Sequence, residues 1–387
     1  MKHTLIVVTT LLLVSLLLSA EPLLEKSEVF PPGFNGIARY RIPGIVVTTK
    51  GTVLAYAEAR KDSSSDWGEI EIHLRRSTDG GKTWEASKHI AHHGTRLEGN
   101  PHKNDETGAR EQTVNNPVAI VDHETGAIEF LYCINYARCY SMRSTDDGLT
   151  WSQPVDITAS FEPFRAKVDW KVIATGPGHG IQIKSGRLVV PIWLAYGKEG
   201  DHAPSAAGTI FSDDHGKTWQ AGDLCLPNEG DFGNPNETMI TELSDGRVML
   251  VSRSVPKANR KLITTSPDGA RNWTKPVFHD QLWEPICMAS IVAHPSKPGT
   301  LIFSNPHTLK LEKDGKEVPA GRGKRENLSI KLSRDDGKTW PINKTLDPGK
   351  AAYSDLAVLP DGTVLCLYEA DTNIVSARFN LEWITAP

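Results

Sequence analysis

The residues most suited to chemistry first appear in the segment 234–254, NPNETMITELSDGRVMLVSRS. Glu237 stands at the start of a β-prone run, Arg253 stands at the end of the next run, and the turn Ser244–Gly246 separates the two. A hairpin closed at this turn brings the carboxylate of Glu237 beside the guanidinium of Arg253. On residue types alone this pair is either part of a functional site or a surface ion pair, which would contribute under about 1 kcal/mol to stability.

Three other segments place reactive or charged side chains beside β-prone runs. The polar loop SSSDWGE carries Asp66, with Asp62 and Glu69 close by, between two strand patterns. Tyr353 opens the run YSDLAVL, and Arg41 begins the run RIPGIV. Taken singly, Asp66 would be a loop residue that caps a turn, Tyr353 a packing residue with a solvated hydroxyl, and Arg41 a surface charge.

A repeated eight-residue phrase indicates which elements position these side chains. The phrase reads STDGGKTW, STDDGLTW, SDDHGKTW, SRDDGKTW and, more weakly, SPDGARNW, and these copies begin at Ser77, Ser144, Ser212, Ser333 and Ser266, respectively. Its Asp can accept hydrogen bonds from nearby amides, its Gly permits a positive φ, and its Trp can cover the hairpin with a large apolar face. We interpret the phrase as scaffold, because a catalytic site is assembled once from different residues.

Alternating β-prone runs precede the copies, such as EIEIHLRR before the first and NLSIKLS before the last. Alternation with a period of two, broken by clusters of Gly, Asp and Pro, predicts antiparallel hairpins, and no long amphipathic helix is expected. Copies that recur every 54 to 68 residues predict an array or propeller of small sheets, and therefore an all-β fold. A propeller brings the inner strand ends of its blades around one axis, where distant residues can form a single pocket.

The phrase resembles the Asp box, or BNR repeat, of the sialidases (neuraminidases), which reads S-x-D-x-G-x-T-W. Four copies match it, whereas the copy at Ser266 has Ala270 in place of the Gly and Asn272 in place of the Thr. The resemblance implies a six-bladed β-propeller of four-stranded sheets that occupies residues 21–387 as a single domain. The boxes support this fold more strongly than they support a reaction, since other secreted propellers carry them.

Segments outside the boxes also resemble the sialidases, and they imply a triad of arginines that binds the substrate carboxylate. The motif R-I-P implies Arg41 as its first member, and the pattern N-E, L-x-D-G-R, R-S implies Arg253 as its second. The pattern R-x-N-L implies Arg325 as the third member, with Arg322 as a nearby rival. Glu369, in the motif L-Y-E, is similar to the carboxylate that orients the first arginine.

The same resemblance implies three catalytic residues. Tyr353, in Y-S-D-L, is similar to the family's nucleophile, and Glu237 to the base that takes the tyrosine proton. Asp66 best fits the position of the acid/base catalyst, and the neighbouring acids of its loop are weaker candidates. Arg60, in E-A-R, resembles the arginine that contacts the O4 region of the sugar.

Two further stretches match the family without a clear role. They are TVNNP at 113–117 and GPGHGIQ at 176–182, and we expect both to form loops on the active face. His179, within the second stretch, has the residue type of a catalytic imidazole, but no partner motif accompanies it.

Together these segments imply an exo-α-sialidase, a glycoside hydrolase that removes terminal sialic acids from glycoproteins, glycolipids or oligosaccharides with retention of configuration. A neutral tyrosine suits this substrate, because a carboxylate nucleophile would be repelled by the carboxylate on the reacting carbon. Three alternatives stay open: a non-catalytic glycan-binding propeller, a trans-sialidase of the same fold, and a hydrolase for a related keto-sugar that lacks the N-acetyl group.

Composition agrees with an exported globular protein. The chain of 387 residues is 23% charged with a net charge of −4, so no general attraction to nucleic acid is expected. The predicted activity uses no metal or cofactor. Residues 1–20 have the pattern of a cleaved export signal, although the uncharged stretch Thr4–Ala20 could also be an uncleaved anchor. Of the five cysteines, Cys133 and Cys139 are close enough in sequence to pair, but most are expected as free buried thiols.

Overall fold

A computed structural model of the protein gives its fold. The residues that it describes are 20–61, 65–91, 96–98, 100, 112–197, 202–255, 257–311, 317–319 and 323–387. Their one α-helix is α1 (Leu381–Thr385), and they also form the short 3₁₀ helices Phe34–Gly36, Thr158–Ala166 and Gly230–Phe232. No helix within these residues has the length and apolar character needed to cross a membrane. The regular structure of the described chain is otherwise β, which confirms the all-β prediction.

Four sheets are built mainly from strands that follow one another in the chain, and one strand, β11, joins the sheet before its own. The first holds β2 (Arg39–Val47), β3 (Val53–Arg60), β4 (Ile70–Ser77) and β5 (Lys88–His89). The second holds β6 (Val114–Val121), β7 (Ile128–Ile134), β8 (Arg138–Ser144) and β9 (Val155–Asp156), with β11 (Gly178–His179) parallel to β6. The third holds β10 (Val172–Thr175), β12 (Ile181–Gln182), β13 (Leu188–Ala195), β14 (Ser205–Ser212) and β15 (Gln220–Ala221). The fourth holds β16 (Thr238–Glu242), β17 (Val248–Ser252), β18 (Arg260–Ser266) and β19 (Val277–Trp283).

The last sheet is larger and joins the two ends of the described chain. Its seven strands are, in spatial order, β1 (Leu24–Phe30), β27 (Asn373–Phe379), β26 (Val364–Ala370), β25 (Ile342–Val358), β24 (Glu326–Ser333), β21 (Leu301–Pro306) and β20 (Ser290–Ala293). The long strand β25 pairs with β24 along its first half and with β26 along its second half. A separate small hairpin consists of β22 (Leu309–Leu311) and β23 (Glu317–Pro319).

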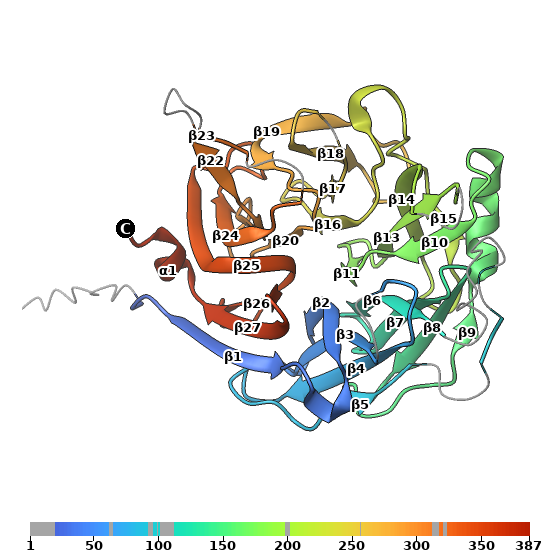
Figure 1. The fold of residues 1–387 in the computed structure, drawn as a ribbon, viewed down its shortest axis with the longest axis horizontal. Coiled ribbons are helices and arrows are strands. Elements are labelled where there is room, and N and C mark those ends of the chain that lie inside the picture. Colours follow the sequence, from blue (N-terminus) through green and yellow to red (C-terminus); the bar gives the residue numbers. More distant parts are fainter. Residues whose placement is uncertain are drawn as a thin grey trace, which may run out of the picture.

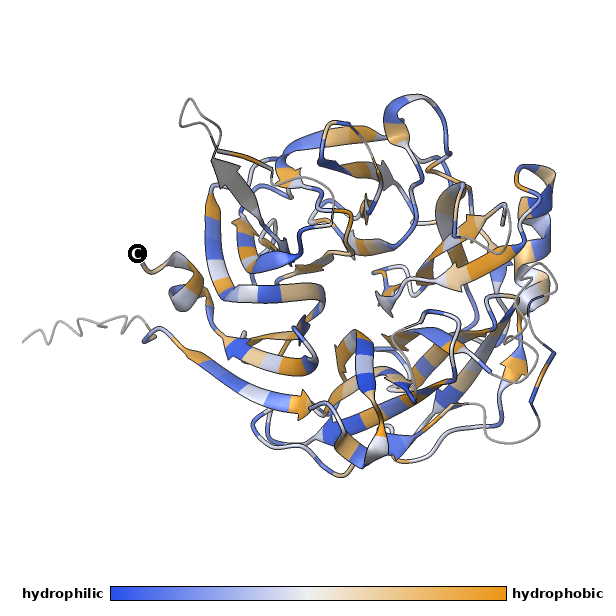
Figure 2. Ribbon diagram, in the orientation of Figure 1, coloured by the Kyte–Doolittle hydropathy of each residue, from blue (hydrophilic) through white to orange (hydrophobic). Residues whose placement is uncertain are grey.

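The sheets stand around a common centre in chain order (Figure 1). β2 contacts both β6 and β25, and β16 contacts both β13 and β20, so that the inner strands of successive sheets are neighbours. Figure 2 shows apolar and polar positions alternating along strands such as β25. Apolar faces of adjacent sheets pack together, as where Tyr56 and Ile72 of the first sheet meet Phe130 and Tyr132 of the second. This arrangement directs the inner strand ends of separate sheets toward one region.

The Asp boxes form turns, as the sequence predicted. In the first box, the Asp79 carboxylate accepts hydrogen bonds from the Ser77 hydroxyl at 2.7 Å, the Thr83 hydroxyl at 2.6 Å and the Thr83 amide at 3.0 Å. The weak copy keeps the bonds from Ser266 and from following amides to Asp268, but it lacks the threonine. No box residue lines the pocket described below, so the boxes are scaffold.

Asp79→Ala should lower stability without changing the chemistry of the folded protein. The substitution removes these turn bonds together with one from the Lys82 amide, and we expect a loss of about 1–2 kcal/mol in the free energy of unfolding. Denaturant unfolding and kcat per folded molecule check this. As a control, Asp361→Ala removes a turn carboxylate that accepts one bond, from the Thr363 amide, and should cost less. A fall in kcat of folded Asp79→Ala would contradict the scaffold interpretation.

Glu129, on β7, should make stability depend on pH. Burial raises its pKa to about 7, although Arg143 Nη1 lies 2.6 Å from its carboxylate and opposes the shift. Between 4.5, the ordinary pKa, and about 7 the folded state binds more protons than the unfolded state, so stability falls as pH rises through this window. The glutamine of Glu129→Gln cannot ionise. The free energy of unfolding of this variant minus that of the wild type should therefore rise by about 1–3 kcal/mol from about pH 5 to about pH 8. Unfolding curves of both proteins across this range test it, and a difference that does not vary with pH would refute it.

All five cysteines are free and buried, which confirms the expectation of unpaired thiols. Cys133 and Cys139 lie directly opposite each other on β7 and β8 but form no disulfide.

Candidate active site

Tyr353, Glu237 and Arg253 form the centre of the site. Glu237 precedes β16, Arg253 follows β17, and the Arg253 amide donates to the Glu237 carbonyl at 2.8 Å, which confirms the predicted hairpin. The Tyr353 hydroxyl, on β25, donates to Glu237 Oε1 at 2.5 Å. Arg253 Nη1 donates to Glu237 Oε2 at 2.5 Å and to the Tyr353 oxygen at 2.8 Å. The phenol is therefore held between a carboxylate that accepts its hydrogen bond and a guanidinium that donates to its oxygen.

The electrostatic surroundings of Tyr353 act in opposite directions. Burial and the Glu237 carboxylate raise the pKa of the phenol, and the nearby guanidiniums lower it by less, so the pKa lies well above its ordinary value. The side chain is 4% exposed. The resting phenol is thus protonated at neutral pH.

Arg41 is aimed by an irregularity in β2. The pairing of β2 with β3 shifts between Arg41 and Gly44, and Ile42 in this bulge has a φ of 56°. A side chain at Gly44 would meet the Tyr56 ring, because a Cβ there would lie 2.1 Å from a ring carbon. Glu369 Oε1 accepts bonds from the Ile42 amide at 3.0 Å and from Arg41 Nε at 3.2 Å. The strained bulge and the carboxylate together fix the direction of the Arg41 guanidinium.

Three guanidiniums converge on Tyr353 from different sheets. Arg41 and Arg325 lie over its ring, with their guanidinium carbons 5.2 Å and 5.3 Å from the ring centroid, while Arg253 bonds to its hydroxyl. Arg325 also donates from Nη2 to the Ile286 carbonyl at 2.6 Å. The rival for its position, Arg322, lies outside the described residues.

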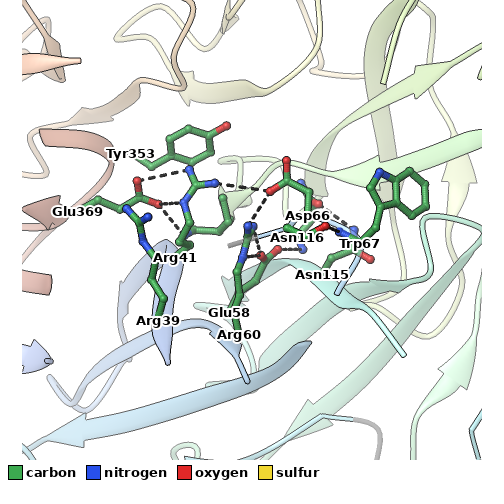
Figure 3. Close-up of polar contacts among 12 residues, drawn as sticks. Arg39, Arg41, Glu58, Arg60, Asp66, Trp67, Asn115, Asn116, Tyr353 and Glu369 are labelled. Carbon is green, nitrogen blue, oxygen red and sulfur yellow. Dashed lines mark hydrogen bonds and ion pairs between the residues drawn. The ribbon is translucent and has the colours of Figure 1, made fainter. Parts of the chain in front are cut away.

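Asp66 lies on the other side of Arg41 from Glu369 (Figure 3). Its Oδ1 is 3.5 Å from Arg41 Nη1 and 2.7 Å from Arg60 Nη1. Arg60 is fully buried and is held by Glu58, whose Oε2 accepts from Arg60 Nη2 at 2.7 Å. The side chain of Asp66 is 43% exposed, so it contacts the solvent as well as the two arginines.

The structure places the acidic residues of this loop differently. Asp66 lines the pocket, whereas Glu69 does not and instead pairs with Arg96 at 2.7 Å. Asp62 lies outside the described residues. Burial would raise the pKa of Asp66, but Arg60 and Arg41 outweigh it, and the pKa lies below its ordinary value. The resting carboxyl is therefore ionised at neutral pH.

The pocket has a volume of about 140 Å³ and includes residues that sequence reasoning missed. Three of its walls are aromatic rings, namely Tyr136, Trp193 and His202. The His202 ring centroid lies 4.6 Å from that of Tyr136 and 5.2 Å from that of Trp193. Single aromatic residues give no functional pattern in a sequence, whereas Glu58 could have been found as a charge within the run VLAYAEAR. Within the described residues, no cluster of three or more His, Cys, Asp or Glu could hold a metal ion.

The two stretches without a clear role behave differently from expectation. Residues 113–117 lie mostly within β6 rather than in a loop, although Asn116 does line the pocket. The expectation is wrong for 176–182, since His179 lines a separate cavity of about 480 Å³ that shares no residue with the pocket. Its Nδ1 lies 2.8 Å from Asp355 Oδ1, which is fully buried, so this imidazole is engaged in the core.

Comparison with known proteins agrees with this geometry. A family described as a BNR repeat-like domain matches residues 51–366. A solved structure of a Hadza microbial sialidase is 30% identical in sequence and superposes with a TM-score of 0.76. The match covers 93% of this chain and 69% of that one. The chain belongs to the sialidase family.

Other relatives of this sialidase-family chain differ in length and chemistry. The sialidase of Micromonospora viridifaciens is 32% identical over 389 residues, which cover 94% of this chain but 55% of that protein. An intramolecular trans-sialidase of Ruminococcus gnavus is 19% identical, with a TM-score of 0.71 and coverage of 93% of this chain and 98% of that one. At this identity the second comparison supports the fold alone.

Proposed function

We propose that the protein is an exo-α-sialidase that hydrolyses terminal, α-ketosidically linked sialic acids of glycoproteins, glycolipids or oligosaccharides. The observation that carries the proposal is the convergence of Arg41, Arg253 and Arg325 on the ring and hydroxyl of Tyr353. Sialic acid carries a carboxylate on the carbon whose glycosidic bond is cut. Guanidiniums gathered beside a nucleophile would bind that carboxylate through bidentate, permanently charged donors and place the carbon next to the phenol.

Tyr353 would act as the nucleophile and Glu237 as its base. Support comes from the 2.5 Å hydrogen bond between them, along which the proton can move as the phenol oxygen attacks. Arg253, 2.8 Å from the same oxygen, would stabilise the charge that develops there. The attack forms a bond between tyrosine and the anomeric carbon, and the leaving glycosidic oxygen takes a proton from an acid.

Asp66 would supply that proton and later activate the water that releases the sugar. Its exposed position beside the arginine clamp, which is formed by Arg41, Arg253 and Arg325, suits contact with the leaving group. Its pKa is low in the free protein because Arg60 and Arg41 face it, and a bound substrate carboxylate would offset the charge of Arg41 and make protonation easier. Two displacements at one carbon give retention of configuration.

The wider architecture would be that of a six-bladed propeller within residues 21–387. Dividing the seven-stranded sheet within β25 gives two four-stranded units, one with β20, β21 and β24 and the other with β26, β27 and β1. With the four separate sheets they make six. Residues 1–20 would direct export to the periplasm or the outside of the cell.

A fluorogenic sialoside, with a matched sugar lacking the N-acetyl group, tests the proposed activity. Release of fluorophore from the first substrate with little from the second supports the proposal, and the reverse preference would identify a keto-sugar hydrolase. Binding without release would identify a glycan-binding propeller. Added lactose distinguishes transfer from hydrolysis, since a trans-sialidase would form sialyllactose in place of free sialic acid.

A further inference from the structure

A fully buried ion pair lies behind the arginine clamp. Lys261, on β18, and Glu284, directly after β19, each have 0% of the side chain exposed, and Lys261 Nζ lies 2.7 Å from Glu284 Oε2. Neither residue lines the pocket. Two buried charges are costly to desolvate, and replacing such a pair by apolar side chains often leaves stability unchanged or higher. The fold alone therefore does not account for this pair.

Both side chains hold the backbone next to the clamp. Glu284 Oε2 accepts from the amide of Ser254, the residue after Arg253, at 3.2 Å. Glu284 Oε1 accepts from the Cys287 amide at 3.0 Å, and Lys261 Nζ donates to the Cys287 carbonyl at 2.5 Å. The pair thus links the end of β17 to the segment 284–287.

The segment 284–287 in turn positions Arg325. Arg325 Nη2 donates to the Ile286 carbonyl at 2.6 Å. Ile286 has a φ of 60°, a conformation that a β-branched residue adopts only when its surroundings impose it. The bonds of the ion pair to Cys287, the next residue, provide that constraint.

We propose that Lys261 and Glu284 are positioning residues of the carboxylate clamp. Their hydrogen bonds to the backbone of Ser254 and Cys287 fix Arg253 and Arg325 relative to each other. This inference rests on the proposed function, since it assigns the pair to the binding of the sialic acid carboxylate.

The test separates positioning from stability with the variants Lys261→Met and Glu284→Met, alone and together. Each single change leaves one buried charge unpaired and should lower the Tm, whereas the double variant should recover most of it. The double variant still lacks the bonds to Ser254 and Cys287. Its Kd for free sialic acid, measured by calorimetry, and its KM for a sialoside should therefore rise on the order of 10-fold, with a smaller change in kcat.

Two controls keep the test decisive. Binding of the sialic acid carboxamide, which lacks the anion, should be weak and equal in wild type and double variant. Glu129→Gln alters another ion pair with a buried carboxylate, which lies in the second sheet and does not line the pocket, and it should leave both Kd and KM unchanged.

The outcomes distinguish this inference from the proposed function. A wild type that neither binds nor cleaves sialosides overturns the function itself. An active wild type together with a thermally recovered double variant of unchanged Kd overturns the positioning role. If the double variant does not fold, Glu284→Gln, which keeps the size and an oxygen acceptor, takes its place: a several-fold higher Kd supports the inference and an unchanged Kd refutes it.

Discussion

Tyr353→Phe is expected to lower kcat on the order of 10³-fold while sialic acid still binds. Phenylalanine keeps the ring over which Arg41 and Arg325 lie, but it lacks the oxygen that would attack the anomeric carbon. Loss of that oxygen also leaves Glu237 without the proton that it would accept. Steady-state kinetics with the fluorogenic sialoside and calorimetry with free sialic acid measure the two effects separately.

Tyr368→Phe is the matched control for this variant. Tyr368, on the adjacent strand β26, is buried, and its hydroxyl donates to Asp347 at 2.9 Å. Neither residue lines the pocket. The control should lose some stability and keep its kcat. If Tyr353→Phe turned over as fast as the control, Tyr353 would not be the nucleophile.

Arg41→Ala is expected to raise KM on the order of 10²-fold, because truncating one partner of a buried charge pair also leaves the other charge unpaired. The variant removes one donor to the substrate carboxylate. It also leaves Glu369 without its charged partner, because in the wild type Arg41 donates to Glu369 at 3.2 Å. The unpaired carboxylate then repels the anionic substrate. Kinetics over a range of sialoside concentrations, with Kd for sialic acid as a second readout, check the effect.

Two further variants give this prediction its controls. Arg41→Lys keeps the charge but not the bidentate fork, so its KM should lie between those of the wild type and Arg41→Ala. Arg187→Ala removes another paired arginine, which bonds to Asp213 at 2.7 Å and Asp268 at 2.8 Å outside the pocket, and its KM should stay normal. An unchanged KM in Arg41→Ala would exclude this residue from the clamp.

Much of the site could be predicted because the family motifs lie on or directly beside strands. R-I-P, N-E and Y-S-D-L each mark a strand that reaches the centre of the molecule, and Arg41, Glu237 and Tyr353 do lie together there. The acidic loop was ambiguous, since Asp66 and Glu69 have the same chemistry and are three positions apart. Only the fold separates them, by turning Asp66 toward Arg60 and Glu69 toward Arg96.

Residues that act through packing could not be predicted. Lys261 and Glu284 lie at or next to strand ends, and no motif in the sequence distinguishes them from other charged residues. Their burial depends on how β18 and the segment after β19 pack behind the clamp. The stretch around His179 was misplaced for the same reason, because its strand β11 joins the second sheet beside a different cavity.

By itself, the sequence determined the features that form over a few residues. The box turns close through bonds from Ser77 and Thr83 to Asp79, and the hairpin at Ser244–Gly246 brings Glu237 to Arg253, because short loops cost little entropy to close. Only the tertiary structure decided that Arg41 meets a carboxylate 328 positions away, at Glu369. Contacts of that kind form when the burial of apolar surface between whole sheets offsets the entropy of ordering the chain between them.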